Sequence, residues 1–237
     1  MFFPKKITGI KESDKVLEVG PGGLPHPRAD VFLDLDPKHF KDSIEESRQR
    51  GLADKIKTDK PIVYYDGGKF PFKDKEFDYV ICSHVVEHVP DPRSFCKELF
   101  RVAKRGYIEY PTVYYDYMYN FDVHPNLVKM AGDTLVYLKK KETSLDEWLP
   151  VQKFFFETLE AQHVQLIDPF EHYYFEGFQW EKPFKVRKAK NIKELTWDKL
   201  TIPRRSPEMT GEIPAIRTLV KRKINRALSR VMGAKNK

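Results

Sequence analysis

The chain has 237 residues, enough to bury the core of one domain with appendages. Hydrophobic residues make up 41% of it and aromatic residues 14%, which excludes an intrinsically disordered protein. The formal net charge is +7, but eight of the 42 basic residues lie in 213–237, where no acidic residue occurs. This leaves 34 basic against 35 acidic residues, and a neutral body argues against a nucleic-acid-binding face outside the tail.

The sequence contains neither a targeting signal nor a redox framework. No apolar run is long enough to span a bilayer, and the N-terminal M-F-F-P-K-K lacks the apolar core of a signal peptide. Cys82 and Cys96 fall on a predicted strand and a predicted helix, without metal-ligand spacing. We therefore expect a cytoplasmic protein with no metal site.

The stretch from residue 15 to residue 36 combines two short apolar runs with a glycine turn between them. The runs at 16–19 and 31–35 have the continuous apolar pattern of strands that are covered on both faces. Glu18 interrupts the first run, and a carboxylate at such a position is costly unless it has a partner. The pattern predicts two buried strands with a charged group at the turn between them.

The turn and the end of the second strand have features of a nucleotide site. Gly20 and Gly22 permit sharp bending of the backbone and close approach of a ligand. Asp34, at the end of the second strand, is placed to accept hydrogen bonds from ribose hydroxyls. A dinucleotide site would need a third glycine, but Pro25 stands there, and with Pro27 it disfavours a helix facing a pyrophosphate. The turn therefore favours a cofactor without a pyrophosphate.

A second group of polar residues follows the third and fourth predicted strands. The third strand runs over 61–66, and F-P-F and F-D-Y-V segments lead into the fourth. Ligands bind to open parallel sheets at the carboxyl ends of the strands. The residues expected at these two strand ends are Asp66, Gly67, Ser83 and His84.

In this order, the motifs resemble the class I S-adenosylmethionine-dependent methyltransferases of the methyltransferase-11 type, over about residues 14–111. The resemblance implies S-adenosylmethionine as the cofactor. It implies that Glu18 orients the turn and helps to place the amino end of the cofactor, and that Asp34 takes the ribose hydroxyls. Asp66 would accept from the adenine amino group, and the Gly67 amide would meet the ring. The implied cofactor-binding set is Glu18, Gly20, Gly22, Asp34, Asp66, Gly67 and Ser83.

The expected fold is α/β, with a Rossmann-like, mostly parallel, seven-stranded sheet flanked by helices. We expect helices at 43–56 and 91–104, the second capped by Asp91 and Pro92, and a fifth strand at 105–110. A short strand at 133–140 and antiparallel edge strands in 171–187 follow. A further helix is expected at 145–163, with Pro150 at its start or at a kink and Trp148 on its buried side.

We divide the chain into a methyltransferase domain (1–190), a linker (191–212) and a basic amphipathic tail helix (213–237). Within the domain, 112–150 is expected to form a lid or substrate wall, because this aromatic-rich segment follows the fifth strand. The tail is expected to rest on an anionic membrane surface, which would place the protein at the inner face of a membrane. Docking of the tail on the body and binding to nucleic acid remain alternatives.

Methyl transfer from a sulfonium requires in-line positioning, and a hydroxyl acceptor also needs a general base. Histidine suits that role, and the candidates are His84, His88 and His124. His124 and His84 are preferred, because His88 most readily begins the turn into the next helix; structural roles are the alternative. Tyr114, Tyr115 and Glu109 are weaker choices. The expected acceptor is a small molecule, sugar or lipid-linked glycan, with RNA or protein as the second hypothesis and a non-catalytic cofactor-binding scaffold as the third.

Overall fold

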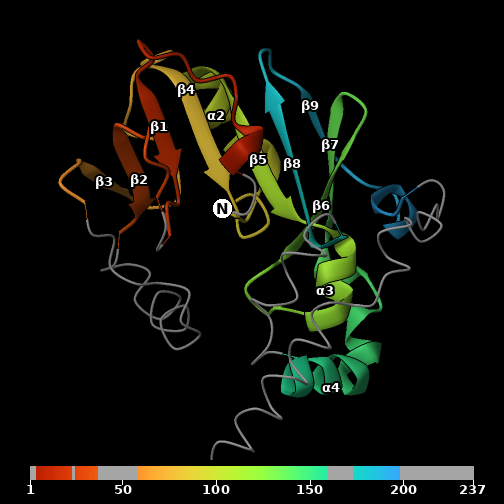
Figure 1. Cartoon of the computed structure of the whole chain (residues 1–237). Coiled ribbons are helices and arrows are strands. Elements are labelled where there is room, and N and C mark those ends of the chain that lie inside the picture. Colours follow the sequence, from red (N-terminus) through yellow and green to blue (C-terminus); the bar gives the residue numbers. More distant parts are fainter. Residues whose placement is uncertain (1–3, 23–24, 37–57, 160–172, 198–237) are drawn as a thin grey trace, which may run out of the picture.

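The computed structural model describes residues 4–22, 25–36, 58–159 and 173–197 (Figure 1). Its central sheet has the strand order β3-β2-β1-β4-β5-β8. Strands β1 to β5 are parallel, and β8 pairs antiparallel with β5. The strand bounds are β1 (Val16–Val19), β2 (Val31–Leu35), β3 (Ile62–Tyr65), β4 (Phe77–Ser83), β5 (Ala103–Pro111) and β8 (Phe175–Trp180).

This order confirms the predicted Rossmann-like α/β fold with an antiparallel edge strand. The predicted count of seven strands is not confirmed, because the central sheet contains six strands in the part of the chain that the structure describes. The order reverses between β1 and β4. Ligands bind to sheets of this kind at that reversal, outside the carboxyl ends of the strands.

Both faces of the central strands are buried, which explains their continuous apolar sequences. Leu17, Val80 and Cys82 point into the main core on the side of helix α2 (Pro92–Val102). The alternate residues Val16, Tyr79, Ile81 and Tyr107 form a second cluster, against which Ile7 and Ile10 of the N-terminal segment pack. Short 3-10 helix η1 (Pro4–Lys6) precedes that segment.

Helix α2 begins where the sequence predicts. Asp91 is its N-cap: one carboxylate oxygen accepts from the Arg93 amide at 3.0 Å and the other from the Ser94 hydroxyl at 2.7 Å. Phe95 and Leu99, one turn apart, are buried against the sheet. The connection from β4 through α2 to parallel β5 is the crossover expected of this architecture.

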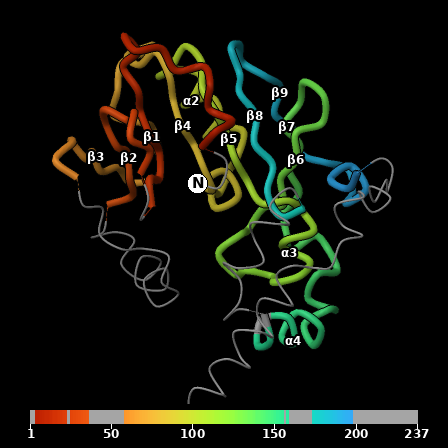
Figure 2. The backbone as a smooth tube through the Cα atoms, viewed as in Figure 1, coloured from red at the N-terminus to blue at the C-terminus, as the bar shows by residue number. Residues whose placement is uncertain are grey.

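A smaller sheet lies on the β8 side of the central sheet (Figure 2). It consists of β6 (Asn126–Ala131), β7 (Thr134–Lys139) and β9 (Lys185–Lys188), in the order β6-β7-β9. Strand β7 confirms the strand predicted at 133–140. The edge strands predicted in 171–187 are confirmed for β8 but wrong for β9, which pairs parallel with β7. Pro183, which has no amide hydrogen, separates β8 from β9 and cannot continue the ladder of the central sheet.

The residues between β5 and β8 include two helices beyond the carboxyl end of β5: α3 (Val113–Tyr119) and α4 (Leu149–Leu159) (Figure 1). Two 3-10 turns, η2 (Lys140–Glu142) and η3 (Leu145–Trp148), precede α4. Pro150 is the second residue of α4, where a proline is tolerated. The expectation that Trp148 is buried is wrong: its side chain, at the junction of η3 and α4, is half exposed, whereas Leu145 at the start of η3 is buried.

Tyr110 connects the two sheets. Its hydroxyl donates to a Glu176 carboxylate oxygen on β8 at 2.9 Å and accepts from the Met130 amide on β6 at 2.6 Å. The other Glu176 oxygen accepts from the Trp197 indole at 3.1 Å, and Leu195 in η5 (Ile192–Leu195) is buried. The first residues of the predicted linker therefore pack against the domain.

Several predicted features lie outside the described residues. They are the helix at 43–56, the end of the helix at 145–163, the linker beyond residue 197 and the basic tail at 213–237. In the described part of the chain, no helix combines the length and the hydrophobicity needed to cross a membrane.

Gly106 on β5 tests the packing of the central sheet. An added Cβ would lie 2.4 Å from the Val80 carbonyl oxygen and 3.0 Å from the Trp180 ring, so neither side can yield without moving the backbone. We expect Gly106→Ala to lower the free energy of unfolding by about 2 kcal/mol or more in urea denaturation. Lys104→Ala, at an exposed position of the same strand, should change it by less than about 1 kcal/mol. An equal effect of the two variants would contradict this packing.

Candidate active site

The glycine turn follows β1 at the reversal of the strand order. Gly20 and Gly22 have φ values of +62° and +57°, in the left-handed region. An added Cβ on Gly20 would lie 2.5 Å from a methyl carbon of Val85, so this glycine lets the turn pack against the residues that follow β4. A Cβ on Gly22 would meet no heavy atom of the described residues within 4 Å. As far as the described residues go, Gly22 therefore borders space that a ligand can occupy.

Glu18 lies directly beneath this turn and is 2% exposed. One carboxylate oxygen accepts from the His26 amide at 2.7 Å. Burial raises the pKa of Glu18 to about 7, although the hydrogen bond from His26 acts in the opposite direction. The hydrogen bond and nearby charges therefore do not fully offset the cost of burying ionised Glu18. A cationic ligand group beside this carboxylate would stabilise its ionised form.

Asp34 and Asp66 lie at the ends of the next two strands. Asp34 is partly buried, which raises its pKa, and it accepts from the Leu35 amide at 2.9 Å. Asp66 follows β3 and accepts from the Gly68 amide at 2.9 Å, while Gly67 between them has a φ of +85°. Because β1, β2 and β3 are parallel, Glu18, Asp34 and Asp66 lie along the carboxyl edge of one sheet. The structure thus brings together the carboxylates that the sequence predicts for the cofactor.

A buried polar network occupies the carboxyl ends of β4 and β5. Ser83 and Glu109 are paired across the two strands, and the Ser83 hydroxyl donates to Glu109 at 2.7 Å. The other Glu109 oxygen accepts from the Tyr107 hydroxyl at 2.7 Å. Ser83 therefore orients a fully buried carboxylate, and its contact with a cofactor stays a prediction.

His84 joins this network to the turn after β4. Its Nε2 lies 3.2 Å from Glu109, and its Nδ1 lies 3.2 Å from Glu87. Burial lowers the pKa of His84, but the contacts with the Glu109 and Glu87 carboxylates outweigh it, so the pKa is raised. His84 consequently holds two buried carboxylates that come from different segments.

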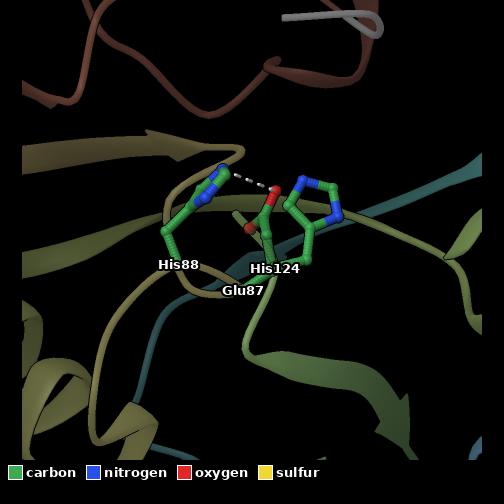
Figure 3. Close-up of side chains that lie close together, drawn as sticks. All are labelled: Glu87, His88 and His124. Atoms are coloured by element: carbon green, nitrogen blue, oxygen red, sulfur yellow. Dashed lines mark ion pairs between the residues drawn. The ribbon is translucent and has the colours of Figure 1, made fainter. Parts of the chain in front are cut away.

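His124 lies on the loop between α3 and β6 and is 8% exposed. Its Nδ1 is 3.0 Å from a carboxylate oxygen of Asp116 on α3. Its ring packs against the ring of His88 with 4.7 Å between centroids, and Glu87 lies between these two histidines (Figure 3). Residues 84–88 and 116–124 are therefore assembled at one place.

Sequence reasoning did not select Glu87 or Asp116 as functional residues, and it ranked His88 below His84 and His124. Glu87 and His88 read as the start of a turn, and Asp116 is eight residues from His124, a spacing that no local motif explains. The feature of the sequence that could have identified Glu87 is its position between apolar residues in V-V-E-H-V. This carboxylate is 0% exposed here and requires compensation.

The comparisons with known proteins agree with this geometry. Residues 17–108 match the family model described as a methyltransferase domain. The matched segment contains the glycine turn and β1 to β4, and it ends within β5. These residues are therefore similar to a methyltransferase domain, and the class I enzymes that share such a domain use S-adenosylmethionine as the cofactor.

Two relatives and one solved structure illustrate the similarity. The chain is 30% identical to norajmaline N-methyltransferase of Rauvolfia serpentina, over 46% of this chain and 34% of the relative. It is 33% identical to sterol 24-C-methyltransferase erg6 of Schizosaccharomyces pombe, over 41% of this chain and 27% of the relative. The structure of a SAM dependent methyltransferase from Aquifex aeolicus is 22% identical, with 47% of this chain and 65% of that chain covered and a TM-score of 0.32. The chain thus spans about a third of the length of the named relatives.

The buried Glu18 predicts a pH dependence of stability. Its folded pKa of about 7 lies above the ordinary value of 4.5, so folding favours the protonated form. The contribution of protonated Glu18 to the free energy of unfolding is fully present below pH 4.5 and is lost as the pH rises through 7. The pKa shift corresponds to about 3 kcal/mol at most. Relative to Glu18→Gln, the wild type should lose free energy of unfolding over this interval in urea denaturation at stepped pH. A constant difference between the two proteins would contradict the raised pKa.

Proposed function

We propose that the chain is an S-adenosylmethionine-dependent methyltransferase that acts on a small-molecule, sugar or lipid-linked glycan acceptor. The observation that carries this proposal is the left-handed position of Gly22, uncrowded by the described residues, at the strand reversal in the turn that follows Glu18. Open space against a glycine backbone is what a bound cofactor needs for close approach. The matched methyltransferase domain contains both residues.

The described residues fit this cofactor. Glu18 would face its cationic amino end, and the binding would offset the cost of the ionised buried carboxylate. Asp34 would accept from the ribose hydroxyls. Asp66 and the Gly67 amide would hold the adenine at the end of β3. When bound, S-adenosylmethionine supplies an electrophilic methyl group on a sulfonium, so the protein must position the acceptor and exclude water.

A buried aromatic cluster lies beyond the carboxyl end of β4. Tyr115 packs against Tyr119, Phe121 and Phe175 with ring centroids 5.0–5.2 Å apart. Phe175 also packs edge-on against His84 at 5.0 Å. The cluster therefore adjoins His84 at the carboxyl end of β4, where it gives an acceptor site an apolar boundary. The names of the relatives, which refer to norajmaline, a sterol and demethylmenaquinone, point to small molecules.

His124 is the best-oriented candidate for a general base. The Asp116 carboxylate can only accept, so it fixes the proton of His124 on Nδ1 and leaves the Nε2 lone pair for an acceptor hydroxyl. His84 contacts two carboxylates and is better suited to holding them.

The basic tail motivates a peripheral membrane role. Its eight basic residues accompany apolar residues at helical spacing, and each basic residue near an anionic surface contributes about 1 kcal/mol. An acceptor embedded in that surface, such as a lipid-linked glycan, would then meet the enzyme there.

The cofactor site is tested by Gly22→Ala. A Cβ at this position costs about 1–2 kcal/mol of strain and fills the space proposed for the cofactor. We expect binding of S-adenosylmethionine in calorimetric titration to the wild type and at least tenfold weaker binding to Gly22→Ala. Gly132→Ala is the matched control, because Gly132 has nearly the same φ, +61°, and equally open surroundings on the β6–β7 turn.

Gly132→Ala should lose similar stability and keep the affinity. Absence of heat with the wild type, or equal affinities of the two variants, would refute the cofactor site. Binding without turnover on any acceptor would favour a non-catalytic scaffold.

The tail is tested by co-sedimentation with vesicles that contain anionic lipid. The full chain should sediment with them and a chain ending at Gly211 should not, since the charge that attracts the surface is removed. Equal sedimentation of both would refute the membrane role. A salt-dependent RNA shift that disappears on the same truncation would instead favour an RNA methyltransferase.

A further inference from the structure

We propose that Glu87, His88 and His124 bind a first-row divalent cation such as Zn²⁺ (Figure 3). One ligand atom from each residue lies within 4.8 Å of the others. Two imidazoles and one carboxylate form a known ligand set for Zn²⁺, and three protein ligands leave a coordination position open. Ligand atoms around a tetrahedral Zn²⁺ are about 3.3 Å apart, so the 3.8 Å between His88 Nε2 and Glu87 is already near the bound value.

The tautomers of both histidines suit ligation. His88 Nδ1 is 2.7 Å from the Val123 carbonyl oxygen, and His124 Nδ1 is 3.0 Å from Asp116. A carbonyl and a carboxylate can only accept, so each Nδ1 carries the proton and each Nε2 presents its lone pair. Metal-binding histidines are typically oriented in this way by a backbone carbonyl or a carboxylate. This second set of contacts is independent evidence for a cation between the rings.

The Glu87 carboxylate can take a further partner besides His84. It is 0% exposed, and neither of its oxygens accepts a hydrogen bond of acceptable geometry from the described residues. Its charge faces imidazoles, with His84 Nδ1 at 3.2 Å. A buried carboxylate in this state is costly, and a bound cation would satisfy it directly.

The backbone of the site is held in place before any ligand binds. Asn126, at the start of β6, donates from its side chain to the Val89 carbonyl at 2.7 Å and to the Glu87 carbonyl at 3.2 Å. The backbone N–H of Asn126 also donates to the Glu87 carbonyl oxygen at 3.2 Å. These bonds fasten the turn after β4 to the segment that contains His124. Small rotations of the side chains are then sufficient to close on a cation.

The position of the site suggests what the cation does. Val85, two residues before Glu87, packs against Gly20 of the glycine turn. If the proposed function holds, the open coordination position adjoins the acceptor, and an acceptor oxygen bound there would lose its proton more readily. The acceptor would then be an oxygen donor such as a hydroxyl. In this arrangement the Nε2 lone pair of His124 binds the cation and is not free to act as the general base, so the acidity comes from the metal and the proton passes to solvent.

Metal binding is tested on the full chain without an affinity tag, after dialysis against a chelator. Titration with Zn²⁺ in a calorimeter should show one equivalent of binding. His88→Ala and His124→Ala should weaken it at least tenfold, and Asp116→Asn should weaken it about tenfold through the orientation of His124. Asp122→Asn is the matched control, because this exposed acid lies on the same loop as His124 and outside the cluster; it should keep the wild-type affinity.

A spectrum keeps the proposal testable if a variant does not fold. Co²⁺ added to the wild type should give the intense visible band of a four- or five-coordinate site, and excess Zn²⁺ should abolish it. Only the weak spectrum of the hydrated ion, or Zn²⁺ binding that survives in folded His124→Ala, would overturn the site. Titration of S-adenosylmethionine into the protein after dialysis against the chelator separates the two proposals. If this protein binds S-adenosylmethionine but does not bind Zn²⁺, only the cation site is refuted.

Discussion

The contact between Gly20 and Val85 is the constraint on which the rest of the site depends. The strand order reverses between β1 and β4, so the chain leaves these neighbouring strands in opposite directions. The turn after β1 and the turn after β4 nevertheless touch, because Gly20 has no side chain to keep Val85 away. One edge of the sheet thereby holds the carboxylates of β1 to β3 and, beside them, the polar cluster that follows β4.

Buried charge dominates this edge. Glu18, Glu87 and Glu109 are each nearly or fully inaccessible, and each is compensated differently. Glu109 accepts from Ser83 and Tyr107, Glu87 faces imidazoles, and Glu18 has an amide donor and a raised pKa. An interior with this many carboxylates stabilises the fold less than an apolar one would. The arrangement is better explained by the ligands that these groups can hold.

The smaller sheet and α3 complete the site rather than merely extend the fold. The hydrogen bonds of Tyr110 to β8 and β6, and those of Asn126 to the turn after β4, fix the loop that carries His124. Without this second layer, His124 would be remote from Glu87. The residues after the matched segment therefore supply one of the three side chains of the cluster, His124.

The sequence by itself determined the elements with local causes. The apolar runs of β1 and β4, the glycine turn and the Asp91 cap follow from strand burial, backbone freedom and helix capping, and each appears where predicted. Asp34 and Asp66 could be placed at one edge because parallel strands share their ends.

Only the tertiary structure decided the partners. The assignment of β9 to the smaller sheet, the exposure of Trp148 and the meeting of Glu87, His88 and His124 depend on how distant segments pack. The hydrophobic periodicity of a segment does not indicate which distant residues that segment will contact. A local pattern specifies how a segment folds, and long-range packing specifies which side chains it faces.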